Sequence, residues 1–252
     1  MKISLIVAVY NRDDCILRAL NSIKSQTYKD IEIVVIDGAS SDNTIEIAKS
    51  VLSENDILNS EKGSGIYHAL NKGIKNSSGD IIGFLHSDDL YYDNNVISKI
   101  QDFFYKDSSL DIVFGNATFF KKGMTNKIIR NYQSDNLSIK NLAWGKMPAH
   151  TAMFFKKKLF QNYGMFNIRY EICGDYEFIC RIMATKNIKS LYIPETFIKM
   201  QIGGISTRGL RSAITVNKET LMACRENGIY TNIFMIMSKY PSKIMQLIYT
   251  GS

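Results

Sequence analysis

Four short apolar stretches in the first 85 residues alternate with segments whose apolar residues recur at helical spacing. The apolar stretches are residues 3–9, 31–36, 57–58 and 81–85, and the helical segments are 13–25, 43–52 and 66–74. A contiguous apolar run without helical period is typical of a strand that is buried on both faces. This alternation predicts an α/β fold with a mostly parallel, Rossmann-like sheet and right-handed crossovers.

Residues 79–92 read GDIIGFLHSDDLYY, and their apolar run ends in two adjacent carboxylates, Asp88 and Asp89. Open α/β sheets bind ligands at the carboxyl ends of their strands. Tyr10 and Asp37 follow the first two strands, so we expect them along the same edge of the sheet. The pattern indicates a site for a divalent cation and a nucleotide sugar. In the stretch alone, a helix cap made by Asp88 or Asp89 is an equally good interpretation.

Two glycine-rich phosphate-binding motifs are missing from the sequence. Neither G-x-G-x-x-G nor G-x-x-x-x-G-K-[ST] occurs, which argues against a dinucleotide fingerprint and against a P-loop. Carboxylates with few glycines indicate instead a nucleotide whose phosphates are neutralised by a metal. Magnesium and manganese suit such a site, because one or two carboxylates and the substrate phosphates are enough to hold them.

The rest of the chain predicts a mixed set of elements. Helices are expected at 94–105, 157–163, from about residue 175 and at 208–226, and strands at 111–120, 151–155, 189–193 and 196–201. Residues 121–146 are polar and irregular, which predicts a hairpin and a loop. They contain Trp144, which we expect to anchor the core, with stacking on a sugar as the alternative. Asp175 begins a helix, where the helix dipole stabilises a carboxylate, although a plain N-cap is the simpler interpretation.

The net charge of +7 fits an anionic substrate, an anionic membrane surface or nucleic acid, and does not choose between them. The basic residues are dispersed along the chain without a basic stripe or a recognition motif. We therefore expect no nucleic-acid partner.

The cysteine pattern and the absence of export signals indicate a cytoplasmic protein. No C-x-x-C pair joins the four cysteines, which predicts free thiols and no zinc site. The N-terminus does not resemble a signal peptide, and no run of about 18 apolar residues occurs. Residues 229–249 are rich in Ile, Met and Tyr and suit peripheral contact with the cytoplasmic face of the inner membrane. Packing on the chain's own domain or in a homo-oligomer is the alternative.

Five motifs in this order resemble those of glycosyltransferase family 2, whose inverting enzymes have a GT-A fold. The motifs are KISLIVAVYNR at 2–12, IDGASSDNT at 36–44, GIYHALNKGIKNSSGDIIGFLHSDD at 65–89, MPAHTAMFFKKKLF at 147–160 and GDYEF at 174–178. A further turn, GGIS at 203–206, is similar to a bacterial polysaccharide subgroup that includes colanic acid transferases. The resemblance implies a GT-A domain over 1–206, with a nucleotide-sugar half at 1–92 and an acceptor half at 93–206. Residues 207–252 would form a C-terminal helical tail.

The resemblance also implies a role for individual residues. The nucleotide-sugar site would consist of Ala8, Val9, Tyr10, Asp37, Asn71, Ser87 and Asp88. Within it, the Tyr10 ring would lie against uracil, Asp37 would accept a hydrogen bond from the base, and Asp88 would contact the ribose or the sugar. Asp89 would bind Mn²⁺ or Mg²⁺, and Asp175 would be the catalytic base. The donor would be a UDP-sugar, and the acceptor a saccharide or a lipid-linked molecule in surface polysaccharide biosynthesis.

The sequence departs from the family pattern at three places. One is the C-terminal tail, which matches none of the family's motifs. His86 stands at the first position of the acidic triplet, where we expect a neutral hydrogen-bonding histidine rather than a metal ligand. Gly63, Ser64 and His68 replace the charged residues of the subgroup's loop, which affects the choice of donor sugar. Two other functions stay open: a GT-A-fold binding protein with impaired catalysis, and a sugar-nucleotide pyrophosphorylase.

Overall fold

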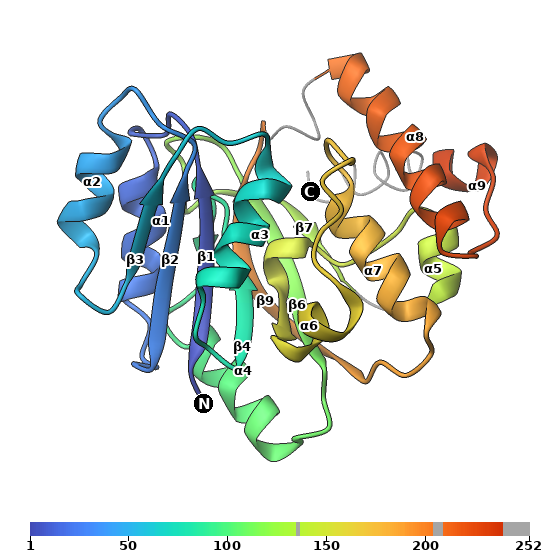
Figure 1. Cartoon of the computed structure of the whole chain (residues 1–252), viewed down its shortest axis with the longest axis horizontal. Helices are drawn as coiled ribbons and strands as arrows, with labels where there is room; N and C mark the ends of the chain where they lie inside the picture. The colour runs from blue at the N-terminus through green and yellow to red at the C-terminus, as the bar shows by residue number, and fades with distance from the viewer. Residues whose placement is uncertain (135–136, 204–208, 239–252) are drawn as a thin grey trace.

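The parallel part of the sheet carries the first four strands. The computed structural model describes residues 1–134, 137–203 and 209–238, and in this part nine strands form one sheet (Figure 1). Its first half has the order β3 (Ile57–Ser60), β2 (Ile31–Asp37), β1 (Ile3–Val9) and β4 (Ile81–Phe84), all parallel. The predicted α/β architecture is therefore confirmed, and the carboxyl ends of these four strands share one edge.

The second half of the sheet is mixed. It continues with β8 (Met153–Lys156), β6 (Ile112–Phe120), β9 (Ser190–Gln201) and the short β5 (Leu90–Tyr91), while β7 (Ile128–Tyr132) pairs with β6. β8 is antiparallel to both β4 and β6. Because β8 joins β4 to β6, it places the mixed half of the sheet directly beside the strand that carries the acidic tip.

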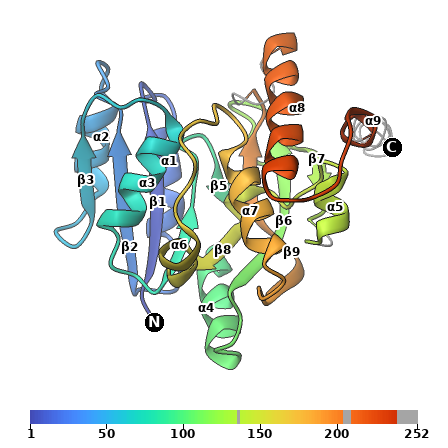
Figure 2. The same cartoon turned by 45° about the vertical axis from the view of Figure 1, so that its right-hand side comes forward.

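Helices cover both faces of the sheet (Figures 1 and 2). One face packs against α1 (Ile16–Lys24), α2 (Thr44–Val51) and α4 (Val96–Lys106), and the other against α3 (Ile66–Asn76), α5 (Ile139–Ala143), α6 (Lys158–Tyr163), α7 (Gly174–Ala184) and α8 (Gly209–Glu226). Along β1 the side chains alternate between the two cores, with Leu5 in one and Ile6 in the other. Burial on both faces explains why the strands read as continuous apolar runs.

The expected elements appear within a few residues of their expected bounds, with three differences. The two runs at 189–193 and 196–201 form one strand, β9, which tolerates Pro194 because its pairing with β6 shifts register beside Gly115. The run at 151–155 begins with a 3₁₀ turn, η1 (His150–Ala152). Two short elements form where none was expected: β5, and α5 (Ile139–Ala143) within the predicted hairpin and loop of 121–146. A short helix, α9 (Ile233–Met237), follows α8 in the expected helical tail.

The prediction that Trp144 anchors the core is wrong. Its side chain is 39% exposed at the C-terminal end of α5, where Leu142 and Ala143 point inward instead. A five-residue helix can bury only one face, and Trp144 follows that face in the sequence. The four cysteines, by contrast, form no disulfide, as expected. The start of the helix at residue 208, residues 204–206 of the GGIS turn and the tail from 239 onward lie outside the described residues.

Gly83 provides a test of how tightly β4 is packed between its neighbours. A Cβ at this position would lie 2.7 Å from the Phe154 ring and 2.8 Å from Leu5. We expect Gly83→Ala to lower the free energy of unfolding by about 1–3 kcal/mol, because both neighbours are buried. Gly63→Ala is the matched control, since no atom lies within 4 Å of its added carbon. Equal urea midpoints for the two variants would contradict this packing.

Candidate active site

The acidic tip is a tight turn directly after β4. The Leu85 N–H donates to the carbonyl of Ile6 at 3.0 Å, so the chain stays paired with β1 as it leaves the strand. The Asp89 N–H then donates back to the His86 carbonyl at 3.0 Å and closes the turn. Ser87 and Asp89 are buried, and Asp88 is half-buried. The two carboxylates therefore lie at the carboxyl edge of the sheet and do not cap α4, which starts at Val96.

Asp89 has one carboxylate oxygen that is bonded and one that is not. Its Oδ1 accepts a hydrogen bond from the Gln201 N–H at 3.0 Å, at the end of β9. Its Oδ2 is buried and has no hydrogen-bond partner within the described ranges. Burial and the nearby charge of Asp88 raise the pKa of Asp89 well above its usual range. An unpartnered buried oxygen is costly unless a ligand completes it.

The donor set fits a divalent cation that the substrate helps to hold. No group of three or more His, Cys, Asp or Glu that could bind a metal occurs in the part of the chain that the structure describes. Oxygen donors are what Mg²⁺ and Mn²⁺ prefer, and one or two carboxylates suffice when phosphate oxygens complete the shell. Asp89 Oδ2 could supply one such oxygen, and Asp88 lies next to it in the same turn.

The loops after β1 and β2 are joined by hydrogen bonds. Asp37 is buried, and its carboxylate accepts bonds from the N–H and the hydroxyl of Ser40 and, at 2.6 Å, from the hydroxyl of Ser60. An ionised carboxylate can accept about four bonds, so one acceptor site is left for a ligand. The Tyr10 ring is 60% exposed and packs at one edge against Gly38. Its face is therefore open to a planar base.

Other residues of the expected nucleotide site differ in their exposure. Val9 is buried, whereas Ala8 is half-buried. Asn71 is engaged by protein backbone: its Nδ2 donates to the Phe166 carbonyl at 2.8 Å, and its Oδ1 accepts from the Phe166 N–H at 2.9 Å. The Asn71 amide therefore holds the loop after α6 in place. A contact between Asn71 and the donor stays a prediction.

Asp175 lies in the first turn of α7, on the face of the sheet that α3 also covers. Its carboxylate accepts hydrogen bonds from the Tyr176 N–H at 2.8 Å and from the Tyr67 hydroxyl at 3.2 Å. Burial raises the pKa of Asp175 to about 6, against the opposite effect of these two bonds. A carboxyl group that ionises near pH 6 can accept a proton from a substrate under neutral conditions.

Gly174 makes room for the tyrosine that contacts Asp175. A Cβ at position 174 would lie 2.8 Å from the Tyr67 ring, closer than any real contact. The same Tyr67 hydroxyl has one proton, which it shares between the Asp175 carboxylate and the Ile172 carbonyl. The residue type at position 174 therefore decides whether Tyr67 can reach both the turn and Asp175.

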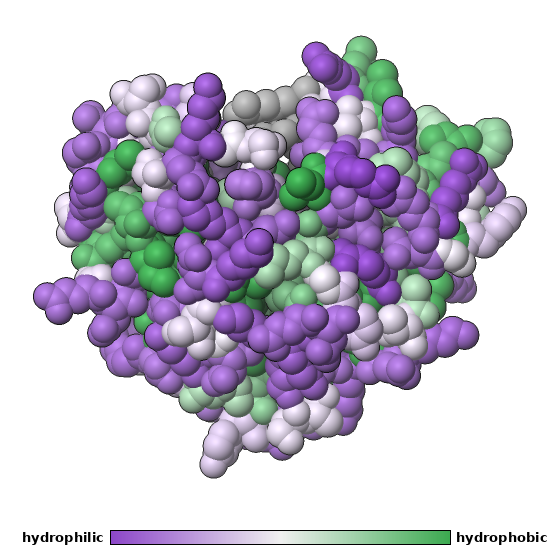
Figure 3. Space-filling view, viewed as in Figure 1, coloured by the Kyte–Doolittle hydropathy of each residue, from purple (hydrophilic) through white to green (hydrophobic). Residues whose placement is uncertain are grey.

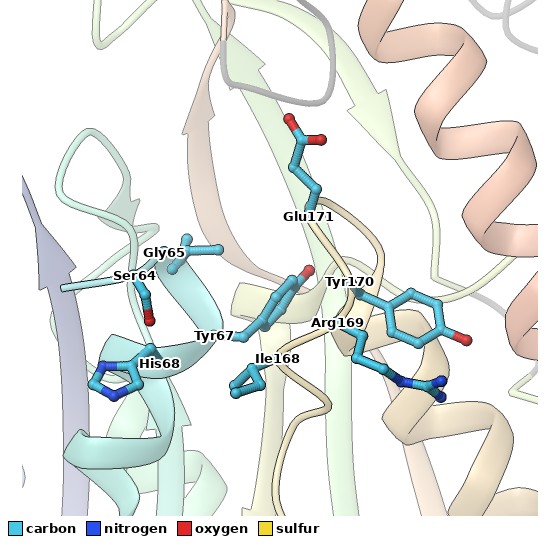
Figure 4. Close-up of a pocket in the computed structure, with 9 residues that line it drawn as sticks. Ser64, Gly65, Tyr67, His68, Ile168, Arg169, Tyr170 and Glu171 are labelled. Carbon is cyan, nitrogen blue, oxygen red and sulfur yellow. The ribbon is translucent and has the colours of Figure 1, made fainter.

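A cavity of about 230 Å³ opens beside this tyrosine. It is lined by Ser64, Gly65, Ile66, Tyr67, His68, Ile168, Arg169, Tyr170 and Glu171. Figure 4 shows the start of α3, with Ser64 and His68, facing the loop that carries Arg169 and Tyr170. Two of the three positions that depart from the subgroup's loop, Ser64 and His68, thus line the same cavity as Tyr67, which contacts Asp175.

Two histidines and one arginine near these groups are neutral or already engaged. Burial lowers the pKa of His150 to about 3, and its ring stacks on Phe84 at 4.6 Å. Burial also lowers the pKa of His86, which supports the expected neutral form. Arg181 pairs with Glu177 at 3.0 Å and donates to the carbonyls of Tyr163 and Met165, so it has a structural role.

Tyr67, Gly174, Gln201 and Glu219 contribute to the site but were not singled out from the sequence. Their roles arise from tertiary contacts, and their spacing in the chain carries no signal. Tyr67 and Gly174 lay within recognised motifs, at 65–89 and 174–178, whereas Gln201 and Glu219 lay in none.

Comparison with known proteins gives a family and a fold. The family model described as glycosyl transferase family 2 matches residues 4–174. A "PGL/p-HBAD biosynthesis glycosyltransferase" of Mycobacterium tuberculosis is 28% identical over 211 residues, which cover 81% of this chain and 78% of that protein. An uncharacterised glycosyltransferase of Rickettsia conorii is 30% identical over 183 residues, which are 69% of this chain and 30% of its own length.

Two solved structures share the fold at low sequence identity. Staphylococcus aureus TarS 1–349 in complex with UDP-GlcNAc has a TM-score of 0.70 at 16% identity, over 88% of this chain and 66% of that one. The mannosyltransferase PcManGT from Pyrobaculum calidifontis, in complex with GDP-Man and Mn²⁺, has a TM-score of 0.66 at 19% identity, over 92% of this chain and 65% of that one. The chain thus spans about two thirds of each. These likenesses confirm the predicted GT-A fold.

The titration of Asp175 can be measured without any substrate. We expect its side-chain carboxyl carbon to titrate in NMR with a midpoint of about pH 6. The Tyr67 hydroxyl stabilises the ionised form, so Tyr67→Phe should raise the midpoint. Tyr105→Phe, at an exposed position on α4, is the control and should leave it unchanged. A midpoint near 4 in the unmodified protein would contradict the described environment.

Proposed function

The chain belongs to glycosyl transferase family 2, and we propose that it moves a sugar from a nucleotide donor to an acceptor hydroxyl with inversion at the anomeric carbon. The observation that carries this proposal is Asp175, a half-buried carboxylate with a pKa of about 6, whose hydrogen-bond partner Tyr67 lines a cavity. The donor edge at Asp37 and Asp88 lies at the ends of parallel strands, as a nucleotide requires.

The donor, a UDP-sugar, would bind along the carboxyl edge of β1, β2 and β4. The exposed ring of Tyr10 offers a stacking surface for uracil, with Ala8 and Val9 beside it. The remaining acceptor site of Asp37 suits an N–H of the base. Ser87 and Asp88 would contact the ribose or the sugar. The UDP-GlcNAc of the TarS structure and the GDP-Man of PcManGT support a nucleotide sugar in general, without choosing the base.

Asp89 would hold Mn²⁺ or Mg²⁺ through its unpartnered Oδ2, together with the diphosphate of the donor. The cation, when bound, stabilises the negative charge that develops on the leaving nucleoside diphosphate. The Gln201 N–H keeps the other oxygen of Asp89 in place, so the free oxygen has a fixed direction. The Mn²⁺ in the PcManGT structure supports this assignment.

Asp175 would act as the general base. The acceptor oxygen attacks the anomeric carbon as the bond to the diphosphate breaks, and its proton passes to the Asp175 carboxylate. Tyr67 orients that carboxylate through its hydroxyl. Attack from the face opposite the leaving group inverts the anomeric configuration.

The acceptor would be a saccharide or a lipid-linked molecule of surface polysaccharide biosynthesis. Leu210, Ile214, Tyr230 and Phe234 on and between α8 and α9 are all more than 60% exposed. Figure 3 shows hydrophobic residues at the upper right, where Figure 1 places these two helices. This surface supports contact with a membrane that holds such an acceptor. No helix of the described ranges is long and apolar enough to cross a membrane.

The two competing functions explain fewer of the observations. A sugar-nucleotide pyrophosphorylase has no use for a base on α7, and the loop after β1 lacks the glycines of a phosphate loop. A binding protein without catalysis would not need a buried carboxyl group with a pKa raised to about 6.

Asp175→Asn tests the base. We expect sugar transfer to fall by about 10²–10⁴-fold while donor binding changes little, because the amide keeps the shape of the side chain but cannot take a proton. In the unmodified protein, kcat/KM should rise with pH and reach half its plateau near pH 6, where Asp175 loses its proton. The measurement is release of nucleoside diphosphate from a panel of nucleotide sugars with Mn²⁺, with and without acceptor. Transfer by the variant at the unmodified rate would exclude Asp175 as the base.

Asp89→Ala tests the metal site. Calorimetry with UDP and Mn²⁺ should show binding to the unmodified protein, and a loss of at least about tenfold in affinity for the variant, because a carboxylate ligand is removed. Chelation of the metal should weaken UDP binding to the unmodified protein and change little in the variant. Asp80→Ala, an exposed acid before β4, is the control. Equal metal dependence of UDP binding in the unmodified protein and in Asp89→Ala would show that the cation binds at another place.

A further inference from the structure

Glu219 on α8 binds the backbone of the turn that leads into Asp175. Its Oε1 accepts the N–H of Glu171 at 2.7 Å, and its Oε2 accepts the N–H groups of Ile172 and Cys173 at 2.9 and 2.8 Å. Three successive N–H groups that point at one carboxylate form an anion-binding nest. The side chain is buried, so water contributes little to holding the turn.

The same turn is held from the opposite side by α3. The Tyr67 hydroxyl donates to the carbonyl of Ile172, whose N–H is bound by Glu219. Both backbone polar groups of Ile172 are therefore fixed by side chains from two different helices. Glu171 lines the cavity, and Asp175 lies two residues beyond the turn. The turn thus links the wall of the cavity, at Glu171, to the start of the helix that carries Asp175.

The charge of Glu219 needs an explanation. Within the ranges that the structure describes, no Lys, Arg or His forms an ion pair with it. A buried carboxylate without a cation is costly unless hydrogen bonds compensate it. Only an acceptor-only group can receive three N–H donors, because an amide would present its own N–H groups to the nest. The turn therefore requires an acid at this position.

We propose that Glu219 is a positioning residue for the transfer reaction, which holds residues 171–173 so that Asp175 meets the acceptor hydroxyl. The proposal rests on the function proposed above. It makes α8, which lies beyond the matched residues 4–174, part of the catalytic unit.

Glu219 also acts on Asp175 through its charge. Its negative charge favours the protonated form and adds to the effect of burial, which is the main reason for the raised pKa of Asp175. The charged or titratable groups around this region are Tyr67 and His68 on α3, Arg169, Tyr170, Glu171 and Cys173 on the loop before α7, Tyr176 and Glu177 on α7, and Glu219 on α8. Of these, Glu177 is paired with Arg181, whereas Glu219 combines an unpaired formal charge with burial in the described part of the chain, so its removal should be visible in the titration of Asp175.

The test compares Glu219→Gln and Glu219→Asp with the unmodified protein. For Glu219→Gln we expect the plateau of kcat to fall at least about tenfold, because a small displacement of a base has large effects. The acidic limb of its pH profile should move to lower pH, because a negative charge is lost. Glu219→Asp keeps the charge but shortens the reach, so its plateau should fall while the limb stays in place. UDP binding with Mn²⁺ should be unchanged in both.

The control is Glu46→Gln, an exposed acid in the first turn of α2. It removes the same charge far along the chain from the turn and should leave the plateau and the limb unchanged. If Glu219→Gln does not fold, Glu219→Asp alone decides, through its plateau. An unchanged plateau and limb in the Glu219 variants, with active unmodified protein, would overturn the proposal.

A second readout separates this proposal from the proposed function. The carboxyl carbon of Asp175 can be titrated by NMR without substrate, and its midpoint should fall in Glu219→Gln and stay constant in Glu46→Gln. Absence of transfer from every nucleotide sugar by the unmodified protein would contradict the proposed function. An unchanged Asp175 midpoint and unchanged amide shifts at 171–173 in Glu219→Gln would contradict the role of Glu219.

Discussion

The packing of one ring, Phe166, holds the two halves of the site together. Its centroid lies 5.4 Å from that of Phe84, the last residue of β4, and 5.4 Å from that of Phe178, one turn after Asp175 on α7. Its backbone is paired at both N–H and carbonyl with the amide of Asn71 on α3. The strand with the acidic tip and the helix with the base therefore share one rigid contact. Protein interiors transmit displacement because they are close-packed, so this core fixes the separation between Asp89, the proposed metal ligand, and Asp175, the proposed base.

Buried carboxylates in this protein fall into two groups. Glu177 is paired with Arg181 and Glu32 with Lys2, each at 3.0 Å, and hydrogen bonds to Glu32 outweigh its burial and lower its pKa. Asp89 and Glu219 have no such cation among the described residues. An unpaired buried acid lowers stability, and natural proteins keep such groups where function requires them. We therefore assign the acids with a cation partner to the stability of the fold, and Asp89 and Glu219 to the proposed site.

The sequence predicted the first half of the sheet, because each of its strands can be recognised from its own residues. Burial on both faces made the strands apolar runs, and the ends of those runs placed Asp37 and Asp88 at one edge. The base, Asp175, needed a resemblance, because an acid at a helix start is also an ordinary cap. Glu219 could not be found in this way, since its three partners are backbone N–H groups 46–48 residues away, and backbone groups leave no residue signature. The prediction for Trp144 was wrong for a related reason, because the burial of a residue at a five-residue helix depends on what packs against that helix.

The match to the family ends at residue 174, one residue before the carboxylate that we assign as the base. The matched residues include nearly all of the four parallel strands, at whose carboxyl ends the proposed donor residues lie. The position of Asp175, the proposed base, depends instead on the turn before it, which Tyr67 and Glu219 hold from earlier and later parts of the chain. Ala223 and Cys224 of α8 also lie in the same core as α7. The domain boundary at 206/207 stays a prediction. The packing of α8 in the same core as α7 makes α8 a support of the helix that carries Asp175.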